Sequence, residues 1–225
     1  MEKTNLERLE HIAGGMDDLN EKVVYVGGSA CGLYATDTAA VDPRPTNDVD
    51  CGVEIFSYQE YNSFNELLRQ RKFRNDIEPG APICRWIYQD EVVDVMPDDE
   101  TILGFSNRWY RPGFKNRESY ILPSGKTIYI LPVTYYVATK LDAILSRGGQ
   151  DLRVSHDFED VIYVLNYCPE FVERVEHEDE ALKKYLKEQF TSLLQRPNIH
   201  EEIECALPLG EEDRVELILE ILAKC

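Results

Sequence analysis

An apolar strand that runs directly into two glycines constrains the fold of this chain more than any other feature. Residues 23–26 read Val-Val-Tyr-Val, and Gly27, Gly28 and Ser29 follow them at once. A turn of small residues lets backbone N–H groups approach a phosphate closely, because no Cβ atom stands in the way. Taken alone, the same pattern also suits a tight turn from a strand into a helix, which we expect over residues 30–34.

Two aspartates follow after one loop, which we expect over residues 35–47. Asp48 directly precedes, and Asp50 lies within, a segment in which apolar residues alternate with other residues, which predicts a strand over residues 49–55. Side chains at positions i and i+2 of a strand point to the same face, so both carboxylates can hold the same divalent ions. A D-x-D pair by itself is equally compatible with a solvated sheet edge.

A third acid interrupts a strand that is otherwise apolar. Asp94 lies within Val92–Met96, which we expect to form a hairpin with residues 83–88 through a turn at Gln89 and Asp90. A charged carboxylate on a buried strand is costly unless a cation or a donor meets it. Asp94 is either the third metal-binding acid or a strand-end residue capped by backbone N–H groups. With the glycine turn, the three acids favour a site for a metal-bound nucleoside triphosphate.

The order of these motifs resembles the polymerase-beta-like nucleotidyltransferase superfamily, and most closely its abortive-infection branch, whose members include bacterial toxins. The resemblance covers about residues 22–166 and rests on three segments of the chain, namely Gly27-Gly28-Ser29, Arg44-x-Thr46-x-Asp48-Val49-Asp50 and Val93-Asp94-Val95. The branch also carries a later motif with a helix lysine, an arginine and an acid. Lys140, Arg147 and Asp157 match it here, although His156 stands where a lysine is usual.

The resemblance implies a site made of three groups of residues. Its metal ligands would be Asp48, Asp50 and Asp94, and its catalytic set would add Lys140 and Asp157. Contacts to the nucleotide would come from Gly27, Gly28, Ser29, Arg44, Thr46 and Arg147. Arg44 and Thr46 would orient the acid loop or touch phosphate, although they could also be ordinary loop residues.

The helical lysine can also be judged from its own surroundings. The helix expected after Pro132 carries an apolar stripe at i, i+3 and i+4 spacing, and Lys140 falls within it. A lysine on such a stripe either extends to solvent or meets an anion, which here would be a substrate phosphate or Asp157. Asp157 and Asp160 follow a helix-capping Ser155, and acids are common in a first helical turn, so both also have a purely structural interpretation.

These features predict an α/β (α+β) fold with a mixed sheet of the nucleotidyltransferase type flanked by helices. We expect a catalytic sheet domain over residues 1–131 and a helical domain over residues 132–225 that contributes Lys140 and Asp157 to the cleft. Within the first domain, we expect helices over residues 5–13, capped by Thr4, and after Ser57. The second of these helices would carry an apolar stripe of four residues, Tyr58, Tyr61, Phe64 and Leu68.

The implied reaction moves a nucleoside monophosphate from a triphosphate such as ATP to an acceptor, with pyrophosphate as the leaving group. Two Mg²⁺ ions, or Mn²⁺, would serve as cofactors. The family suggests an RNA or tRNA end, a small aminoglycoside-like molecule or a protein side chain as acceptor, and a cognate antitoxin as partner. Two alternatives are a non-catalytic nucleotide- or partner-binding module of the same fold and a phosphohydrolase that uses the same acids.

The overall charge narrows the range of partners. The formal net charge is -18, which disfavours a broad, sequence-neutral grip on duplex nucleic acid. Residues 108–117 nevertheless interleave cations with aromatic rings, which suits either stacking on a base or packing of the rings on the sheet.

The six cysteines and the N-terminus indicate a cellular compartment. The cysteines show no C-x-x-C pair, the N-terminus has no apolar signal segment, and the apolar runs are too short for a bilayer. We therefore expect a cytoplasmic protein without a membrane partner, whose thiols fill the core.

Overall fold

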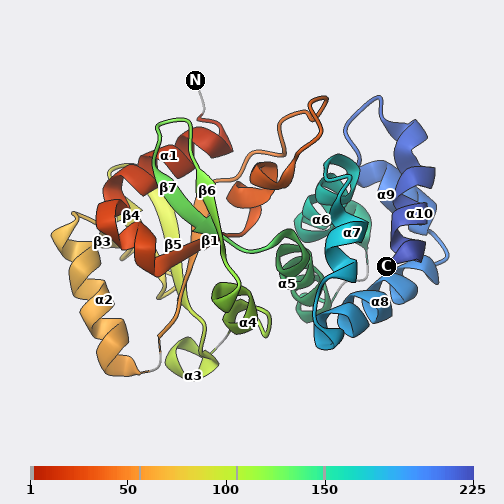
Figure 1. The fold of residues 1–225 in the computed structure, drawn as a ribbon. Helices are drawn as coiled ribbons and strands as arrows, with labels where there is room; N and C mark the ends of the chain where they lie inside the picture. The colour runs from red at the N-terminus through yellow and green to blue at the C-terminus, as the bar shows by residue number, and fades with distance from the viewer. Residues whose placement is uncertain (1–2, 56, 105, 149–150) are drawn as a thin grey trace. The chain divides into compact units, whose positions relative to one another are not determined.

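The chain folds as two compact units in the computed structural model, which describes residues 3–55, 57–104, 106–148 and 151–225. One unit comprises Met1–Ala30 and Arg44–Pro132, and the other comprises Cys31–Pro43 and Val133–Cys225. The first is built around a sheet and the second is helical (Figure 1). The expected division into domains at residues 131 and 132 stays a prediction.

A mixed sheet forms the centre of the first unit. Its strand order is β3-β4-β5-β2-β1-β7-β6 (Figure 1). The β2–β5 and β1–β7 pairs are parallel, whereas the other neighbouring pairs are antiparallel. The strands are β1 (Val23–Val26), β2 (Asp48–Val53), β3 (Arg74–Asn75), β4 (Arg85–Tyr88), β5 (Glu91–Pro97), β6 (Glu118–Ile121) and β7 (Thr127–Ile130). The predicted fold class, a mixed sheet flanked by helices, is confirmed.

Two hairpins of the sheet turn at short loops, and the first of them is where the sequence predicts it. Gln89 and Asp90 join β4 to β5, and Gln89 adopts a positive φ of 54° although it is not glycine. β6 and β7 pair around Gly125, whose φ of 83° suits a residue without a Cβ atom. The first turn matters most for the site, because it fixes which residues of β4 and β5 face each other.

Helices α1 (Asn5–Met16) and α2 (Tyr58–Gln70) of this unit begin where the sequence predicts, whereas no helix was predicted at α3 (Glu100–Leu103) or α4 (Tyr110–Lys115). The 3₁₀ turn η1 (Asp17–Lys22) follows α1, and the 3₁₀ turn η2 (Gly28–Tyr34) includes the last residues of this segment of the unit and the first residues of the second unit. Thr4 caps α1 in a capping box with Glu7, and α1 runs three residues beyond its predicted end. η2 replaces the α-helix expected over residues 30–34, because the chain leaves the glycine turn in tighter 3₁₀ geometry.

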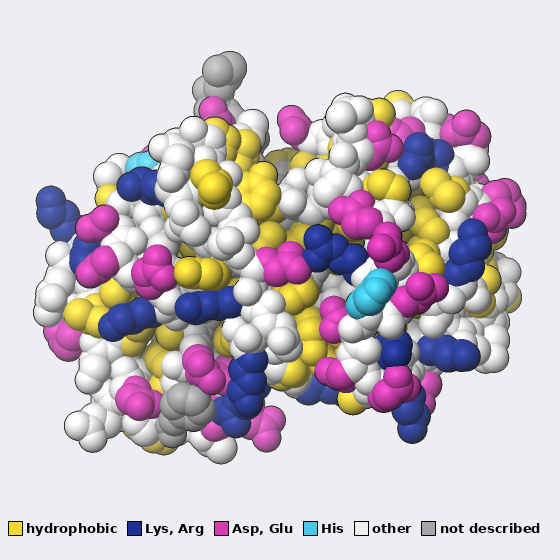
Figure 2. Space-filling view, in the orientation of Figure 1, with side chains coloured by type: hydrophobic (Ala, Val, Ile, Leu, Met, Phe, Trp, Pro, Cys, Tyr) yellow, Lys and Arg dark blue, Asp and Glu magenta, His cyan; other side chains and the backbone are white. Residues whose placement is uncertain are grey.

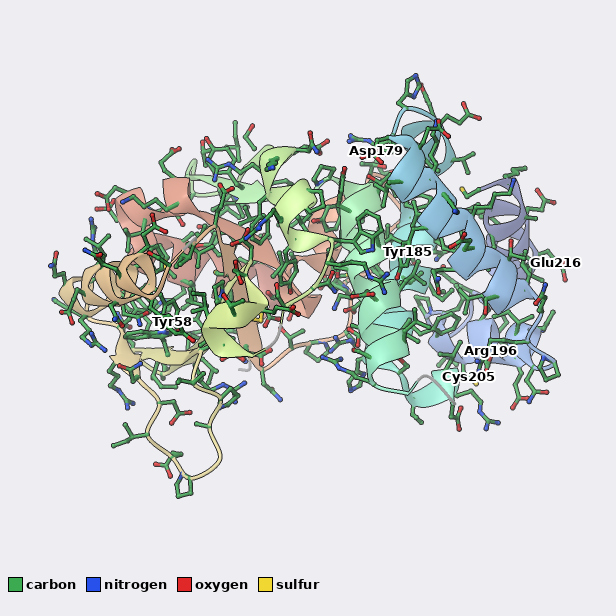
Figure 3. The ribbon with its side chains drawn as sticks, turned by 90° about the horizontal axis from the view of Figure 1, so that it is seen from below. Tyr58, Asp179, Tyr185, Arg196, Cys205 and Glu216 are labelled. Atoms are coloured by element: carbon green, nitrogen blue, oxygen red, sulfur yellow. The ribbon has the colours of Figure 1, made fainter. Side chains whose placement is uncertain are left out.

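The predicted apolar stripe of helix α2 is wrong at one of its four residues, Tyr58. Ser57 caps the helix by accepting from the Glu60 N–H at 3.2 Å, as its sequence predicts. Tyr61, Phe64 and Leu68 are buried, but Tyr58 is exposed. Tyr58, labelled in Figure 3, is the first helical residue, and its hydroxyl donates to the Thr101 carbonyl at 2.7 Å.

The two faces of the sheet are covered by different helices. Helices α1 and α2 lie on the face of Trp86 and Tyr88, because Gly15 of α1 lies against the Tyr88 ring and Arg69 of α2 lies 5.4 Å from the Trp86 ring centroid. Helix α4 lies on the other face, where its Phe114 ring sits directly over Gly52. A Cβ atom at Gly52 would come within 2.0 Å of that ring, so only glycine admits this packing.

The second unit consists of helices and the segment Cys31–Pro43. Tyr34 packs against Tyr136 with ring centroids 4.4 Å apart, and the Tyr163 hydroxyl donates to the Val41 carbonyl at 2.7 Å. Residues 35–47 form a loop, as predicted.

The helices of the second unit are α5 (Val133–Ser146), η3 (Leu152–Val154), α6 (His156–Tyr167), α7 (Phe171–Glu176), α8 (Glu180–Leu194), α9 (Ile199–Ala206), η4 (Glu212–Arg214) and α10 (Val215–Lys224). The predicted apolar stripe of α5 is buried throughout.

The cysteines follow the expectation only in part. Cys31, Cys51, Cys84 and Cys168 are buried, but Cys205 is exposed and Cys225 is half-buried, so these last two do not fill the core. All six are free thiols. Burial, and secondarily the carboxylates of Asp50 and Asp94, raises the pKa of Cys51 well above its usual value. Cys51 is therefore a neutral core residue.

Acidic and basic side chains are interspersed on the face of the protein drawn in Figure 2. Figure 2 shows acidic side chains spread over the visible face of both units, with Lys and Arg side chains between them. None of the helices in the described part of the chain has the length and apolar character needed to cross a bilayer.

Candidate functional site

The sheet brings the three predicted acids to one face. β2 runs parallel to β5 with Asp50 directly opposite Asp94, and Asp48 is opposite Val92. Asp48 and Asp50 share a face because they are two residues apart, and Asp94 shares it because paired residues of neighbouring strands point the same way. Two carboxylates thus come from β2 and the third from the adjacent strand.

An arginine that the sequence analysis missed lies among these acids. Arg85 of β4 is directly opposite Asp94 in the antiparallel β4–β5 pair. Its Nε donates to Asp94 Oδ1 at 2.9 Å and its Nη2 donates to Asp94 Oδ2 at 2.8 Å. The same Nη2 is 3.4 Å from Asp48 Oδ2. The hydrogen bonds to Asp94 raise the pKa of Arg85 above its usual value, although burial opposes the shift.

The sequence contained a signal for this arginine. A two-residue turn at Gln89 and Asp90 sets Tyr88 opposite Glu91. Three residues farther from the turn on each strand, Arg85 is therefore opposite Asp94. The turn lacks glycine, which hides its geometry from sequence reasoning. Its positive φ falls instead on Gln89.

The glycine turn is fitted around the carboxylate of Asp50. Val26, the last residue of β1, is opposite Asp50, so Gly27 follows at the level of the acids. Gly27 has a φ of 68°, and a Cβ atom there would lie 1.9 Å from Asp50 Oδ2. Both the backbone conformation and the approach of the carboxylate therefore require glycine.

Arg44 and Thr46 lie over the second glycine. A Cβ atom at Gly28 would lie 2.6 Å from Arg44 Nη2 and 2.9 Å from Thr46 Cγ2. The Thr46 hydroxyl donates to the Asp48 carbonyl at 3.0 Å, so Thr46 orients the loop that leads into β2. The structure thus brings both residues to the glycine turn beside the acids.

A second residue missed by the sequence analysis supports this loop. Asn5, at the start of α1, accepts from the Thr46 N–H at 2.9 Å and donates to the Arg44 carbonyl at 2.9 Å. The partners are about forty residues away in the chain, so no local pattern points to this role. Asn5 fixes the backbone that carries Arg44 and Thr46.

Ser29, one of the predicted nucleotide contacts, has a hydroxyl that lies within the protein. It is buried, and no other atom in the described part of the chain forms a hydrogen bond with its Oγ. A buried hydroxyl without a partner costs about 1–3 kcal/mol. The position is one where a ligand or water oxygen would satisfy the donor.

The oxygen atoms at the acid centre are of the kind that a hard divalent ion prefers, but the side chains are not arranged around a common ion position. Carboxylate oxygens are preferred ligands of Mg²⁺ and Mn²⁺. However, the described part of the chain contains no three His, Cys, Asp or Glu side chains placed to hold one ion. At Asp94 the reason is visible, since both carboxylate oxygens accept from Arg85.

The helical unit holds a second charged cluster. Lys140 Nζ lies 3.2 Å from Asp157 Oδ1 and 2.7 Å from Asp160 Oδ2, and all three side chains are buried. The exposed Arg147 pairs with the other oxygen of Asp157. The structure therefore brings Lys140, Arg147 and Asp157 together and adds Asp160. His156 is exposed at the first position of α6, with Nδ1 3.4 Å from Glu159.

The cationic and aromatic segment over residues 108–117 uses several of its side chains within the protein. Phe114 is buried over Gly52, and Tyr110 stacks on Phe114 with centroids 5.3 Å apart. Arg117 lies 4.0 Å from the ring centroid of Tyr129. These contacts favour the alternative in which the rings pack on the sheet.

Arg111, in the same segment, is held by an acid that the sequence analysis did not identify. Its Nε donates to Asp98 Oδ2 at 2.9 Å, and Asp98 Oδ1 accepts from the Ile55 N–H at 3.0 Å. Asp98 therefore joins α4 to the end of β2. Its position just after the β5 strand gives no sequence signal, because both partners are distant in the chain.

Comparison with known proteins shows the fold. No protein-family model and no curated protein sequence matches the chain. Among solved structures, the chain is similar to an antigenic nucleotidyltransferase-like protein from Paracoccidioides brasiliensis, with a TM-score of 0.52 and 17% identity over 92% of this chain and 95% of that one. It is also similar to the antibiotic-resistance factor ANT(2'')-Ia, with a TM-score of 0.53 and 14% identity over 86% and 96%. The chain thus has a nucleotidyltransferase-type fold.

Proposed function

We propose that this protein is a metal-dependent nucleotidyltransferase that moves a nucleoside monophosphate from a nucleoside triphosphate to an acceptor. One observation carries the proposal: Asp48, Asp50 and Asp94 lie on one face of adjacent strands, beside a glycine turn fitted to Asp50. The nucleotidyltransferase-type fold supports the same reaction class.

In this proposal, the residues of the sheet unit divide the work. Asp48 and Asp50 hold the metal ions, and Asp94 completes the site near the acceptor, where its carboxylate favours deprotonation of the attacking group. Gly27, Gly28 and Ser29 bind the β- and γ-phosphates, with Arg44 and Thr46 over the turn. Bound Mg²⁺ or Mn²⁺ would neutralise the triphosphate and stabilise the entering and leaving oxygens.

The residues of the helical unit have a supporting role. The family resemblance implies that Lys140 balances the charge of the triphosphate, Asp157 positions Lys140 and Arg147 contacts phosphate, and these roles stay predictions. The pairing of Lys140 and Arg147 with Asp157 supports the positioning role of this acid. The buried ion pairs also hold α5 against α6, so this cluster serves the fold as well.

The acceptor is an RNA or tRNA end, a small molecule or a protein side chain. The net charge of -18 favours a small or cationic acceptor over a large polyanion. The likeness to an antibiotic-resistance factor keeps a small molecule among the candidates. Membership of the toxin branch, a cognate antitoxin and a cytoplasmic location complete the proposal.

One observation favours a second candidate, a non-catalytic nucleotide- or partner-binding module. Arg85 holds Asp94 through both carboxylate oxygens, as a permanent structural ion pair would. If that pair never opens, the centre retains two acids at most for a metal ion. Binding of triphosphate that is indifferent to Mg²⁺ would identify this module.

The test follows labelled phosphorus into an acceptor. The protein is incubated with each α-labelled triphosphate and Mg²⁺, together with total RNA, a small-molecule extract or itself. We expect one pool to gain label, and we expect Asp50→Ala to reduce this labelling about a thousandfold, because the metal contributes several kcal/mol to the transition state. A phosphohydrolase would instead release phosphate without labelling any pool.

The matched control is Asp213→Ala. Asp213 is an exposed aspartate in η4 of the helical unit, outside both charged clusters. We expect full labelling from this variant. Equal labelling by Asp50→Ala and wild-type protein would contradict the proposed function.

A further inference from the structure

Arg85 occupies the position in which a cation shared by two of the acids would lie. Its Nη2 is 2.8 Å from Asp94 Oδ2 and 3.4 Å from Asp48 Oδ2. Its Nε takes the remaining oxygen of Asp94. One guanidinium therefore bridges carboxylates from two strands, β2 and β5.

The position of this bridge is fixed by the sheet and is not an accident of a long surface side chain. Arg85 and Asp94 are direct partners in the β4–β5 ladder, and Asp94 is in turn the partner of Asp50. A bidentate arginine–carboxylate pair is among the strongest ion pairs in proteins. Without a cation, three neighbouring carboxylates would repel one another.

The bridge is also within reach of solvent. The side chains of Asp48, Arg85 and Asp94 are 35%, 27% and 11% exposed, respectively. A hydrated ion can therefore approach the carboxylates, which a fully buried pair would not allow.

We propose that Arg85 is the internal counter-cation of Asp94 and Asp48, and that Arg85 and a divalent cation compete for these carboxylates. The inference rests on the proposed function in one respect, namely that the acids bind a divalent ion. Arg85 holds the centre together when the ion is absent, and it must release Asp94 before this acid can serve as a ligand. Arg85 is thus a positioning residue.

The experiment measures binding of Mn²⁺ alone, by isothermal titration calorimetry, without nucleotide or turnover. Arg85→Gln removes the competing charge, and we expect Mn²⁺ to bind about tenfold more tightly than to the wild type, because a positive charge about 4 Å from the ion is lost. Arg85→Lys keeps the charge but loses the bidentate grip, so we expect a smaller increase. Arg71→Gln removes an arginine that pairs with Asp17 at 2.9 Å outside the acid centre, and it should bind Mn²⁺ as the wild type does.

A second readout covers the case in which Arg85→Gln folds poorly. Without metal, its melting temperature should fall, because the carboxylates lose their cation, and Mn²⁺ should raise it by more than it raises that of the wild type. Unchanged or weaker Mn²⁺ binding by both Arg85 variants would overturn the inference and show that Arg85 orients Asp94 for the metal. Absence of Mn²⁺ binding in all variants would overturn it as well.

The outcome is separable from that of the proposed function. One possible outcome is that Arg85→Gln binds Mn²⁺ more tightly, while neither the wild type nor any variant transfers a nucleotide. This outcome would support competition between Arg85 and the ion and would contradict the proposed enzymatic function. Nucleotide transfer by the wild type, with Mn²⁺ affinity indifferent to Arg85, would do the reverse.

Discussion

Each unit of this protein holds its own cluster of aspartates and cations, and the two clusters differ in how tightly they are closed. In the helical unit, Lys140 and Asp160 are 8% and 1% exposed, and Lys140 binds two carboxylates at once. In the sheet unit, Asp48 is about one-third exposed, and Arg85 reaches it at only 3.4 Å. Lys140, Asp157 and Asp160 of the helical cluster are buried, whereas the acid centre of the sheet is open on one side.

This difference in burial indicates that the helical cluster mainly stabilises the fold, whereas the acid centre of the sheet can bind a ligand. A buried lysine with two acids stabilises the fold only while all members are present, because removal of one leaves a charge without compensation. An open centre can exchange its counter-cation with solvent. We therefore expect changes in the helical cluster to act mainly on stability and changes at the acid centre to act mainly on binding.

The largest expected effect is the loss of stability on replacing Lys140. Lys140→Met removes the buried cation that Asp157 and Asp160 share, and we expect the free energy of unfolding to fall by about 3–5 kcal/mol. Urea denaturation followed by circular dichroism measures it. Asp50→Asn, at the open centre, should change stability by less than about 1 kcal/mol. Equal losses in the two variants would break the distinction between the clusters.

A smaller effect is expected at the glycine turn. Gly27→Ala forces a positive φ on a residue with a Cβ atom and pushes that atom into Asp50 Oδ2, so we expect a loss of about 2 kcal/mol and weaker triphosphate binding. Differential scanning calorimetry and titration with a triphosphate and Mg²⁺ measure the two. Gly14→Ala is the control, because no heavy atom lies within 4 Å of its Cβ position in α1. If Gly27→Ala bound triphosphate as the wild type does, Asp50 would have no part in the nucleotide site.

The smallest expected effect concerns the pH dependence of the helical unit. The hydrogen bonds from Arg196, labelled in Figure 3, lower the pKa of Glu202 below its usual 4.5 in spite of burial. Because the pKa is lower in the folded state, the pair stabilises the protein fully above about pH 4.5, and this contribution is lost as the pH falls through the folded-state pKa.

Glu202→Gln should therefore have a lower free energy of unfolding than the wild type at pH 7. The difference between the two proteins should shrink as the pH falls. Urea titrations between pH 7 and pH 3 follow the difference, with Glu204→Gln on the same helix as control. A difference that stays constant over this range would show that the charge of Glu202 does not stabilise the fold.

The sequence predicted the acid centre better than its surroundings, for a physical reason. The placement of Asp48 and Asp50 on one face follows from the two-residue period of a strand, and Asp94 stands out as a charge in an apolar strand. Arg85 required the register of the β4–β5 hairpin, which a turn without glycine concealed. Asn5 and Asp98 could not be found, because their partners lie far along the chain.

In the helical unit, too, local patterns could be predicted from the sequence, whereas contacts between distant residues could not. The stripe that contains Lys140 is a local pattern, and it correctly placed the lysine toward the core. The second acid on Lys140, Asp160, was masked by the ordinary preference of acids for a first helical turn. The packing of Cys31–Pro43 on the helices depends on contacts such as Tyr34 with Tyr136, which no periodicity reports.

The most direct test of the account is a crystal structure of the protein with Mn²⁺ and a triphosphate analogue that resists transfer, with the ion located by anomalous scattering. We predict an anomalous peak within bonding distance of Asp48 and Asp50, with the phosphates at the Gly27 turn and Arg85 turned away from Asp94. A peak elsewhere, or a bound triphosphate with Arg85 still bidentate on Asp94 and no ion at the acids, would contradict it.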